Sequence, residues 1–309
     1  MPISTGNFAK ALQEGVEGWY GLSYNEYAEQ CKEVFETRTS RKAFEEIVGT
    51  SGLGMAAVKP EGGSVAYDTM QQGFTSRFSH ITYGLGFIIT KEMFDDDLYD
   101  VVAEARSKAL AKSMRITKET VAANIFNRAT NTSYTYGDNS TLLASAAAGS
   151  ATHPHVKGGT YTNSPAALTD FSEAALEDAC IALGKFEDDA GLRIALKPKK
   201  LLVPVDLQFE AERVLNTDLR VASADNDLNA IKSLGKVPGG FTVNNYLTDV
   251  DAWFLITDCT DGLIHFERRA DDFTMDNDHN TDNAMFKATG RYSFGAADSG
   301  RSVYGSVGS

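Results

Sequence analysis

Hydrophobic positions in the middle of the chain recur every three or four residues over an unusually long stretch. Residues 95–129 contain no proline or glycine, and their apolar side chains follow the period of an α-helix. The pattern loses phase near Arg115, where we expect a bend or a change of packing partner. Asp95, Asp96 and Asp97 would lie at the positive end of the helix dipole. A helix of about 45 Å with one broad apolar face needs a sheet or another chain along it.

A second pattern, with period two, precedes this helix. Apolar residues alternate with smaller or polar ones over residues 81–89, glycines punctuate residues 49–73, and residues 59–63 form a turn signal. These features predict an extended β-hairpin over residues 51–90. A two-stranded ribbon is marginal alone in water, so this one should lie on its own domain or on a neighbour. A flexible lid is the competing interpretation.

The rest of the chain divides into a thinly apolar N-terminus and an α/β body. Residues 1–50 are helix-prone, and they either pack on another surface, such as a neighbouring chain, or form a solvated first helix. Residues 130–165 form a long polar loop. Beyond them, Ser172 and Asp206 are expected to cap helices on either side of a buried strand. Further strands are expected at residues 200–204, 241–247, 253–257 and 263–267, and in an alternating tail from residue 285.

Composition and charge narrow the class of protein. With 309 residues, 42% hydrophobic and 23% charged, the chain is an ordinary folded protein. Its 42 acidic and 29 basic residues give a net charge of −13. This argues against a dedicated nucleic-acid binder, because neutralising phosphates supplies most of the affinity of such proteins. Cys31, Cys180 and Cys259 form no CxxC pair and indicate free thiols. The sequence contains no signal peptide or membrane-spanning segment, so we expect no membrane association.

Motifs that carry chemistry are few. Residues 276–282 begin like a calcium loop, but Thr281 and Lys287 stand where such a loop requires glycine and glutamate, so a solvated acidic turn is preferred. His153 and His155 have no neighbour at ligand spacing, and a structural or surface role is preferred for all five histidines. We therefore expect no cofactor, no metal and no catalytic activity. A cytosolic α/β enzyme or a ligand-binding module using residues 131–165 is kept as an alternative of a different class.

Seven short strings, weak singly but persuasive together, carry a resemblance that covers essentially the whole chain. They are Ile125–Ala129, Tyr136–Leu143, His153–Pro154, Gly158–Asn163, Asp188–Gly191, Lys197–Pro204 and Arg291–Gly295. With them the chain resembles the major capsid (head) proteins of tailed bacteriophages, most closely the Mu-like group with the Hong Kong ninety-seven-type shell fold. Asn139 stands where the family would have glycine, a change that asparagine tolerates.

The resemblance implies an α+β fold with named parts. These are an N-terminal arm (1–50), an extended loop (51–90), a peripheral domain (91–169) with a spine helix (95–129), an α/β axial domain (170–270) and a C-terminal return to the peripheral domain (271–309). It further implies a homo-oligomer of hexamers and pentamers that forms an icosahedral or prolate head around double-stranded DNA. A nanocompartment shell of the same fold is the alternative.

Partners, location and contact residues complete the expectation. Portal, scaffold and decoration proteins would be partners, packaged DNA would be near without specific binding, and the subunit would assemble in the host bacterial cytoplasm and reside in the virion. Since the sequence starts at Met1 without a coiled segment, we expect a separate scaffold and no large propeptide. Deleting residues 58–75 should leave a folded chain that forms no particles. Inter-subunit contacts are expected at Arg38, Arg41, Lys59, Glu61, Phe74, Arg77, Phe78, Asp95, Asp96 and Asp97.

Overall fold

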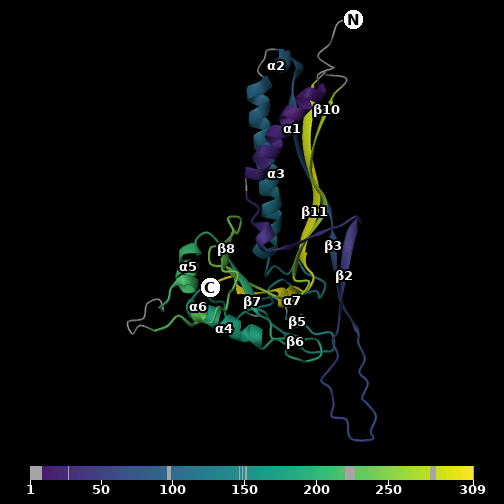
Figure 1. Ribbon diagram of the computed structural model, residues 1–309, viewed down its shortest axis with the longest axis vertical. Coiled ribbons are helices and arrows are strands. Elements are labelled where there is room, and N and C mark those ends of the chain that lie inside the picture. Colours follow the sequence, from purple (N-terminus) through teal and green to yellow (C-terminus); the bar gives the residue numbers. More distant parts are fainter. Residues whose placement is uncertain are drawn as a thin grey trace.

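The long helix and the long strands of the chain lie side by side in one narrow body. The computed structural model describes residues 9–308 except 27, 96–98, 146, 148, 150–151, 220–226 and 279–282. Helices α1 (Ala9–Glu26) and α3 (Tyr99–Asn127) run beside strands β10 (Leu263–Asn277) and β11 (Ala284–Ala296) to form what we call the long body (Figure 1). A smaller α/β part lies at its lower end, and one loop projects away from both.

The predicted helix is confirmed, with its start displaced. A short helix, α2 (Lys91–Asp95), precedes α3, and Asp96 and Asp97 lie outside the described residues. The change of packing partner near Arg115 is also confirmed. Before it, Leu110 and Met114 pack against the long strands, and after it Ala122 and Phe126 pack into a different cluster, where the long body meets the α/β part.

The sheet of the long body has the strand order β1-β10-β11-β4. Strand β1 (Glu36–Thr39) runs parallel to β10, and β4 (Ile81–Ile89) pairs antiparallel with β11. The period-two pattern of residues 81–89 therefore predicted a strand correctly, but the strand is not part of the hairpin. Its partner is β11 because Phe87 stacks on Phe286, and Tyr83 on Tyr292, each with ring centroids 4.9 Å apart.

The hairpin itself is formed by β2 (Phe44–Thr50) and β3 (Gln72–Ser79), which pair antiparallel. Residues 51–71 between them, all of them described, contain no strand, and we call this segment the extended loop. It reverses direction at a turn in which the Gly63 amide donates to the Pro60 carbonyl over 3.0 Å. Gly62 has φ +76° in this turn, a conformation that glycine adopts without strain. The extended loop is the segment that projects from the molecule in Figure 1.

The α/β part contains a second sheet with the order β12-β9-β7-β8. Its strands are β7 (Pro198–Val203), β8 (Phe241–Val243), β9 (Trp253–Thr257) and β12 (Val303–Ser306). Helices α4 (Glu173–Gly184), α5 (Gln208–Asn216) and α6 (Ala230–Ser233) pack against Leu201, Val203 and Trp253 of this sheet. Ser172 caps α4 as predicted, accepting the Ala175 amide over 3.2 Å. The predicted cap at Asp206 is wrong, because α5 follows Leu207 and has no side-chain cap.

The end of the chain differs from the expected boundary between the two parts. Strand β10 enters the long sheet already at Leu263, before the expected boundary at residue 271. After β11 and the short helix α7 (Ser299–Ser302), β12 pairs with β9 in the α/β sheet and does not return to the long body. Gly305 permits this pairing, since a Cβ there would lie 2.3 Å from the Trp253 carbonyl oxygen. A small hairpin of β5 (His153–Pro154) and β6 (Thr160–Tyr161) also packs here, with Tyr161 edge-on to Phe186.

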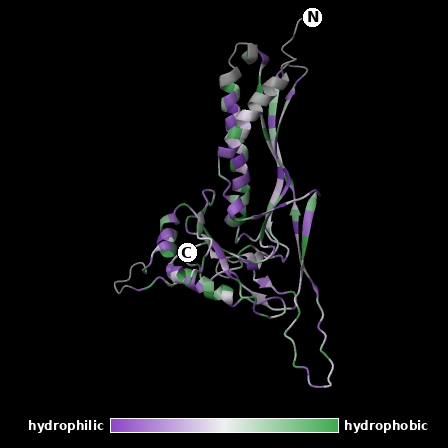
Figure 2. Ribbon diagram, in the orientation of Figure 1, coloured by the Kyte–Doolittle hydropathy of each residue, from purple (hydrophilic) through white to green (hydrophobic). Residues whose placement is uncertain are grey.

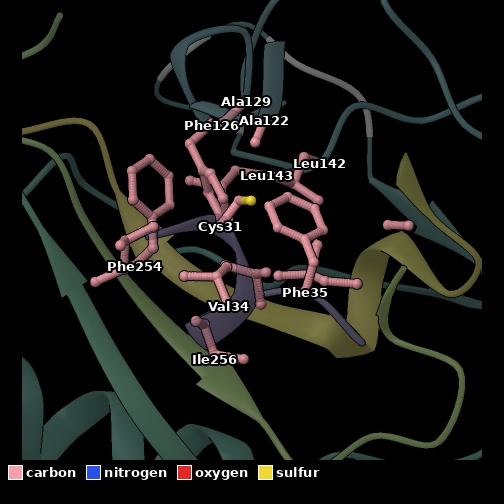
Figure 3. Packing of buried hydrophobic residues seen from close by; sticks show 14 of the residues in the cluster. Cys31, Val34, Phe35, Ala122, Phe126, Ala129, Leu142, Leu143, Phe254 and Ile256 are labelled. Carbon is pink, nitrogen blue, oxygen red and sulfur yellow. The ribbon is translucent and has the colours of Figure 1, made fainter. Parts of the chain in front are cut away.

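The two parts share one hydrophobic cluster. Figure 3 shows Phe35, Phe126 and Phe254 arranged around Cys31, which belongs to the 3-10 helix η2 (Cys31–Glu33). Further towards the N-terminus, Tyr20 of α1 stacks on Phe273 with ring centroids 5.0 Å apart. Tyr20 and the buried residues between Cys31 and Phe35 thus pack on their own chain, so this part of the N-terminal segment is not a solvated helix.

Candidate assembly surfaces

The extended loop exposes apolar side chains that its own chain leaves uncovered. Large apolar residues along it are between 52% and 96% exposed: Leu53, Met55, Val58, Val65, Tyr67 and Met70. Figure 2 shows hydrophobic and hydrophilic residues mixed along this segment. Six large apolar side chains exposed on one projecting segment are typical of a site of interaction in a soluble protein. The extended loop is therefore the strongest candidate for contact with another chain.

The two ends of the extended loop are held together at its base. The amide of Gly54 donates to Asp68 Oδ2 over 2.7 Å, and Lys157 Nζ, from the β5–β6 hairpin, lies 3.2 Å from the same oxygen. The Gly54 hydrogen bond, followed by those of Thr69 and Lys157, keeps the pKa of Asp68 below its usual value. The loop therefore leaves the molecule in a direction that the α/β part helps to set.

Five of the ten predicted contact residues are placed where a neighbour could reach them. Lys59 and Glu61 are exposed near the tip of the extended loop, and Arg41 is exposed between β1 and β2. Phe74 on β3 is partly exposed, and the exposed guanidinium of Arg77 lies 3.8 Å from the centre of the Phe44 ring.

The other five predicted contact residues do not add to this surface. Phe78 is only 4% exposed and packs edge-on to Phe266 with centroids 5.0 Å apart, so its side chain serves its own core and is removed from the candidates. Arg38 bonds within its chain, 2.9 Å from Glu36 and 2.6 Å from Asp261. Asp95 ends α2, and Asp96 and Asp97 lie outside the described residues. These placements leave the hairpin and its loop as the main candidate surface.

A buried polar group, which we call the junction cluster, lies beneath the base of the hairpin and consists of Asp138, His153, Asn163 and Ser299. His153 Nδ1 is 2.6 Å from Asp138 Oδ2, and its Nε2 is 3.2 Å from Asn163 Oδ1. The Asn163 amide donates to the carbonyls of Leu142 and Val303 over 2.8 and 2.9 Å. Ser299 donates its hydroxyl to Asp138 over 3.3 Å.

The junction cluster joins chain segments and is not arranged for nucleophilic catalysis. Both ring nitrogens of His153 are already engaged, and the Ser299 hydroxyl points to the carboxylate instead of the imidazole. Burial acts to raise the pKa of Asp138, but the hydrogen bond and electrostatic attraction of His153, together with hydrogen bonds from Ser140 and Ser299, outweigh burial, and the pKa is lowered. A second buried group lies nearby, where Arg301 bonds Asp298 and Asp189 over 3.0 Å each.

Sequence reasoning assigned the histidines a structural or surface role but did not find these bonds. The sequence nevertheless contained a signal for these residues. Each of them belongs to one of the short strings that carried the resemblance: Asp138, His153, Asn163 and Asp189. Four of the seven strings, spread over residues 136–191, thus meet at one junction, which Ser299 and Arg301 reach from the end of the chain. Within the described residues, no group of three or more His, Cys, Asp or Glu side chains could hold a metal ion.

No helix in the described part of the chain combines the length and the apolar character needed to cross a membrane. Residues 279–282 of the calcium-loop-like segment lie outside the described residues.

Comparisons with known proteins agree with this arrangement. A family model described as phage capsid protein matches residues 73–304. Among solved structures, a chain of Microbacterium phage Oxtober96 is similar, with 9% identity, 92% of each chain covered and a TM-score of 0.56. A capsid chain of a native GTA particle has 14% identity, 90% of each chain covered and a TM-score of 0.54. The virus-like particle from Pyrococcus furiosus has 11% identity, covers 96% of this chain and 99% of its own, and has a TM-score of 0.53. A search of curated protein sequences gave no match.

The family match spans most of the chain, and the structural likeness at these low identities shows the fold. The Mu-like subgroup is not confirmed by these comparisons and stays a prediction. The chain thus belongs to the phage capsid protein family and has the Hong Kong ninety-seven-type fold, which makes it a major capsid protein that forms the head of the virion.

Proposed function

We propose that copies of this chain form hexamers and pentamers of a closed head, and that the extended loop of each copy lies across a neighbouring copy. The single observation that carries this proposal is the row of exposed apolar side chains on the extended loop. Fully burying one such side chain is worth about 1.5–3 kcal/mol, so even partial burial of several would stabilise each contact by several kcal/mol. In this arrangement the long body is the peripheral domain and the α/β part is the axial domain.

The charge of the chain supports a role around packaged double-stranded DNA without tight binding. A net charge of −13 disfavours adhesion of DNA phosphates to the inner wall. Assembly would take place in the host bacterial cytoplasm, with scaffold, portal and decoration proteins as partners. The subunit would act by assembly alone, without cofactor or catalysis.

The test replaces residues 55–67 by a short Gly-Ser linker. Because Gly54 and Asp68 are hydrogen-bonded to each other, the linker closes a gap that is already narrow. This deletion is cleaner than removing residues 58–75, which would also remove the first residues of β3. We expect a soluble, folded subunit that forms no closed particles in negative-stain electron microscopy.

The matched control keeps the whole extended loop and changes an exposed charged residue of the α/β part, Lys199→Ser. This variant should still form particles. If the deletion variant builds closed shells as efficiently as the control, the extended loop does not have the proposed role.

A further inference from the structure

A hollow lies in the helical layer of the α/β part, between α4 and α6. It has a volume of about 430 Å³, and its walls include Cys180, Ile181 and Leu234. Both Ile181 and Leu234 are more than half exposed, so nothing in the described chain covers the hollow. Two basic side chains, Lys185 and Lys236, and one acidic side chain, Glu177, also line it. The hollow therefore combines an apolar interior with a rim that carries one more basic than acidic group.

A single aromatic side chain projects from the neighbouring helix α5. Phe209 is 68% exposed, which makes it the most exposed phenylalanine of the described residues. On α5 the inner face consists of Ala211, Val214 and Leu215, and the helical period puts Phe209 on the opposite face. Glu210 and Glu212 flank it in the sequence, and Arg213 lies one turn further along the same face. Phe209 is thus an apolar projection with two acidic residues and one basic residue beside it.

We propose that Phe209 of one copy of this chain enters the hollow between α4 and α6 of a neighbouring copy. The hollow is large enough for a phenyl ring. Both surfaces carry charges that can pair: Glu210 and Glu212 complement Lys185 and Lys236, and Arg213 complements Glu177. A projection that fits a pocket elsewhere on the same chain makes a head-to-tail contact, which builds a ring when the rotation closes. The inference rests on the proposed function, because it requires copies to assemble side by side, and it adds the residues that join their axial domains.

Cys180 lies in the wall of the hollow, so the reactivity of its thiol should fall when a side chain of a neighbouring copy occupies the hollow. The experiment uses a Cys259→Ser chain, in which Cys180 is the accessible thiol because Cys31 is buried. Burial raises the pKa of the Cys180 thiol, so labelling with a maleimide is done at mildly alkaline pH. We expect Cys180 to react at least tenfold more slowly in particles than in unassembled subunits. In particles of the Phe209→Ala variant this protection should be lost.

The Phe209→Ala change should also raise, about tenfold, the subunit concentration at which particles appear, since truncating a central aromatic anchor commonly costs this much or more. A matched control is Val250→Ala, at an apolar residue that is also about half exposed but lies outside the hollow. This control should leave both the assembly concentration and the protection of Cys180 unchanged.

Chemical cross-linking of residue 209 in one copy to Cys180 in a neighbouring copy provides the second measurement. A disulfide needs Cα atoms within about 7 Å, whereas a phenyl ring reaching into the hollow implies a wider separation, so a short bismaleimide is used. Particles of Phe209→Cys in the Cys259→Ser chain should give a ladder of linked subunits on a denaturing gel. Particles of Val250→Cys in the same chain should give none.

The outcomes separate the inference from the proposed function. If particles form but Cys180 reacts as fast as in free subunits and no ladder appears, the contact is wrong and the head-forming role stands. If Cys180 of free subunits is protected by an added small molecule and not by assembly, the hollow is a ligand site and the proposal is overturned. If the unaltered chain forms no particles, both proposals fail together.

Discussion

The cluster around Cys31 and the extended loop use apolar side chains in opposite ways. In the cluster, residues such as Leu142 and Phe254 are at most 1% exposed and hold the long body to the α/β part. In the extended loop, Tyr67 and Val58 are almost fully exposed and stabilise nothing within the subunit. The contrast indicates that folding of the subunit and closure of the shell depend on different residues, so each can be perturbed without the other.

The largest expected effect is on the free energy of unfolding, and it comes from a substitution in the cluster around Cys31. Phe254→Ala should lower the free energy of unfolding of the free subunit by about 3–5 kcal/mol, because it leaves a cavity beside Phe126. Tyr67→Ala should change it by no more than about 0.5 kcal/mol. Urea unfolding followed by circular dichroism measures both. A cost above about 1 kcal/mol for Tyr67→Ala would mean that the loop packs on its own chain.

A substitution in the junction cluster should have an intermediate effect on the free energy of unfolding, and this effect should depend on pH. Asp138→Asn should cost about 1–3 kcal/mol at pH 7, because it weakens a buried bond to His153. The folded pKa of Asp138 is lowered, so the carboxylate stabilises the fold above its unfolded pKa of about 3.9 and this stability is lost as the pH falls through the lower folded value. The difference in the free energy of unfolding between Asp138→Asn and the unaltered chain should therefore shrink below about pH 4.

Unfolding of the free subunit between pH 7 and pH 3 checks this dependence. Asp206→Asn is the control, since Asp206 is exposed and does not cap α5. It should change the free energy of unfolding by less than about 0.5 kcal/mol at every pH. The Asp138→Asn variant and the unaltered chain should converge at low pH only if this carboxylate carries the stabilising charge. A difference in their free energies of unfolding that stays constant down to pH 3 would contradict that assignment.

The smallest effect concerns the base of the extended loop. Lys157→Met removes the ion pair with Asp68, and for so exposed a pair the free energy of unfolding should change by only about 0.5 kcal/mol or less. Assembly should nevertheless slow, because the direction of the loop is less restricted. Light scattering during assembly measures this, with the exposed Lys199→Met as control. Equal assembly rates for the two variants would show that the ion pair does not orient the loop.

The short-range features of the fold could be predicted because their causes are local. The helix over residues 99–127 follows from a helical apolar period that contains no proline or glycine, although its phase shifts near Arg115. The cap at Ser172 follows from one hydroxyl beside a free amide. Asp206 failed as a cap although its residue type was suitable, because α5 begins only after Leu207. Of the contact candidates, Phe78 failed since sequence alone could not tell which face of β3 meets Phe266.

The sequence by itself determined that residues 81–89 form a strand, that one long helix organises the chain and that few residues carry chemistry. Only the tertiary structure decided that β4 pairs with β11, that β12 joins the α/β sheet, and that Asp138 meets His153 beneath the hairpin. The physical reason is that periodicity and capping depend on neighbours along the chain, whereas pairing and burial depend on which distant segments fit together. Residues of the extended loop find no such fit within the subunit, which leaves their apolar side chains for another copy.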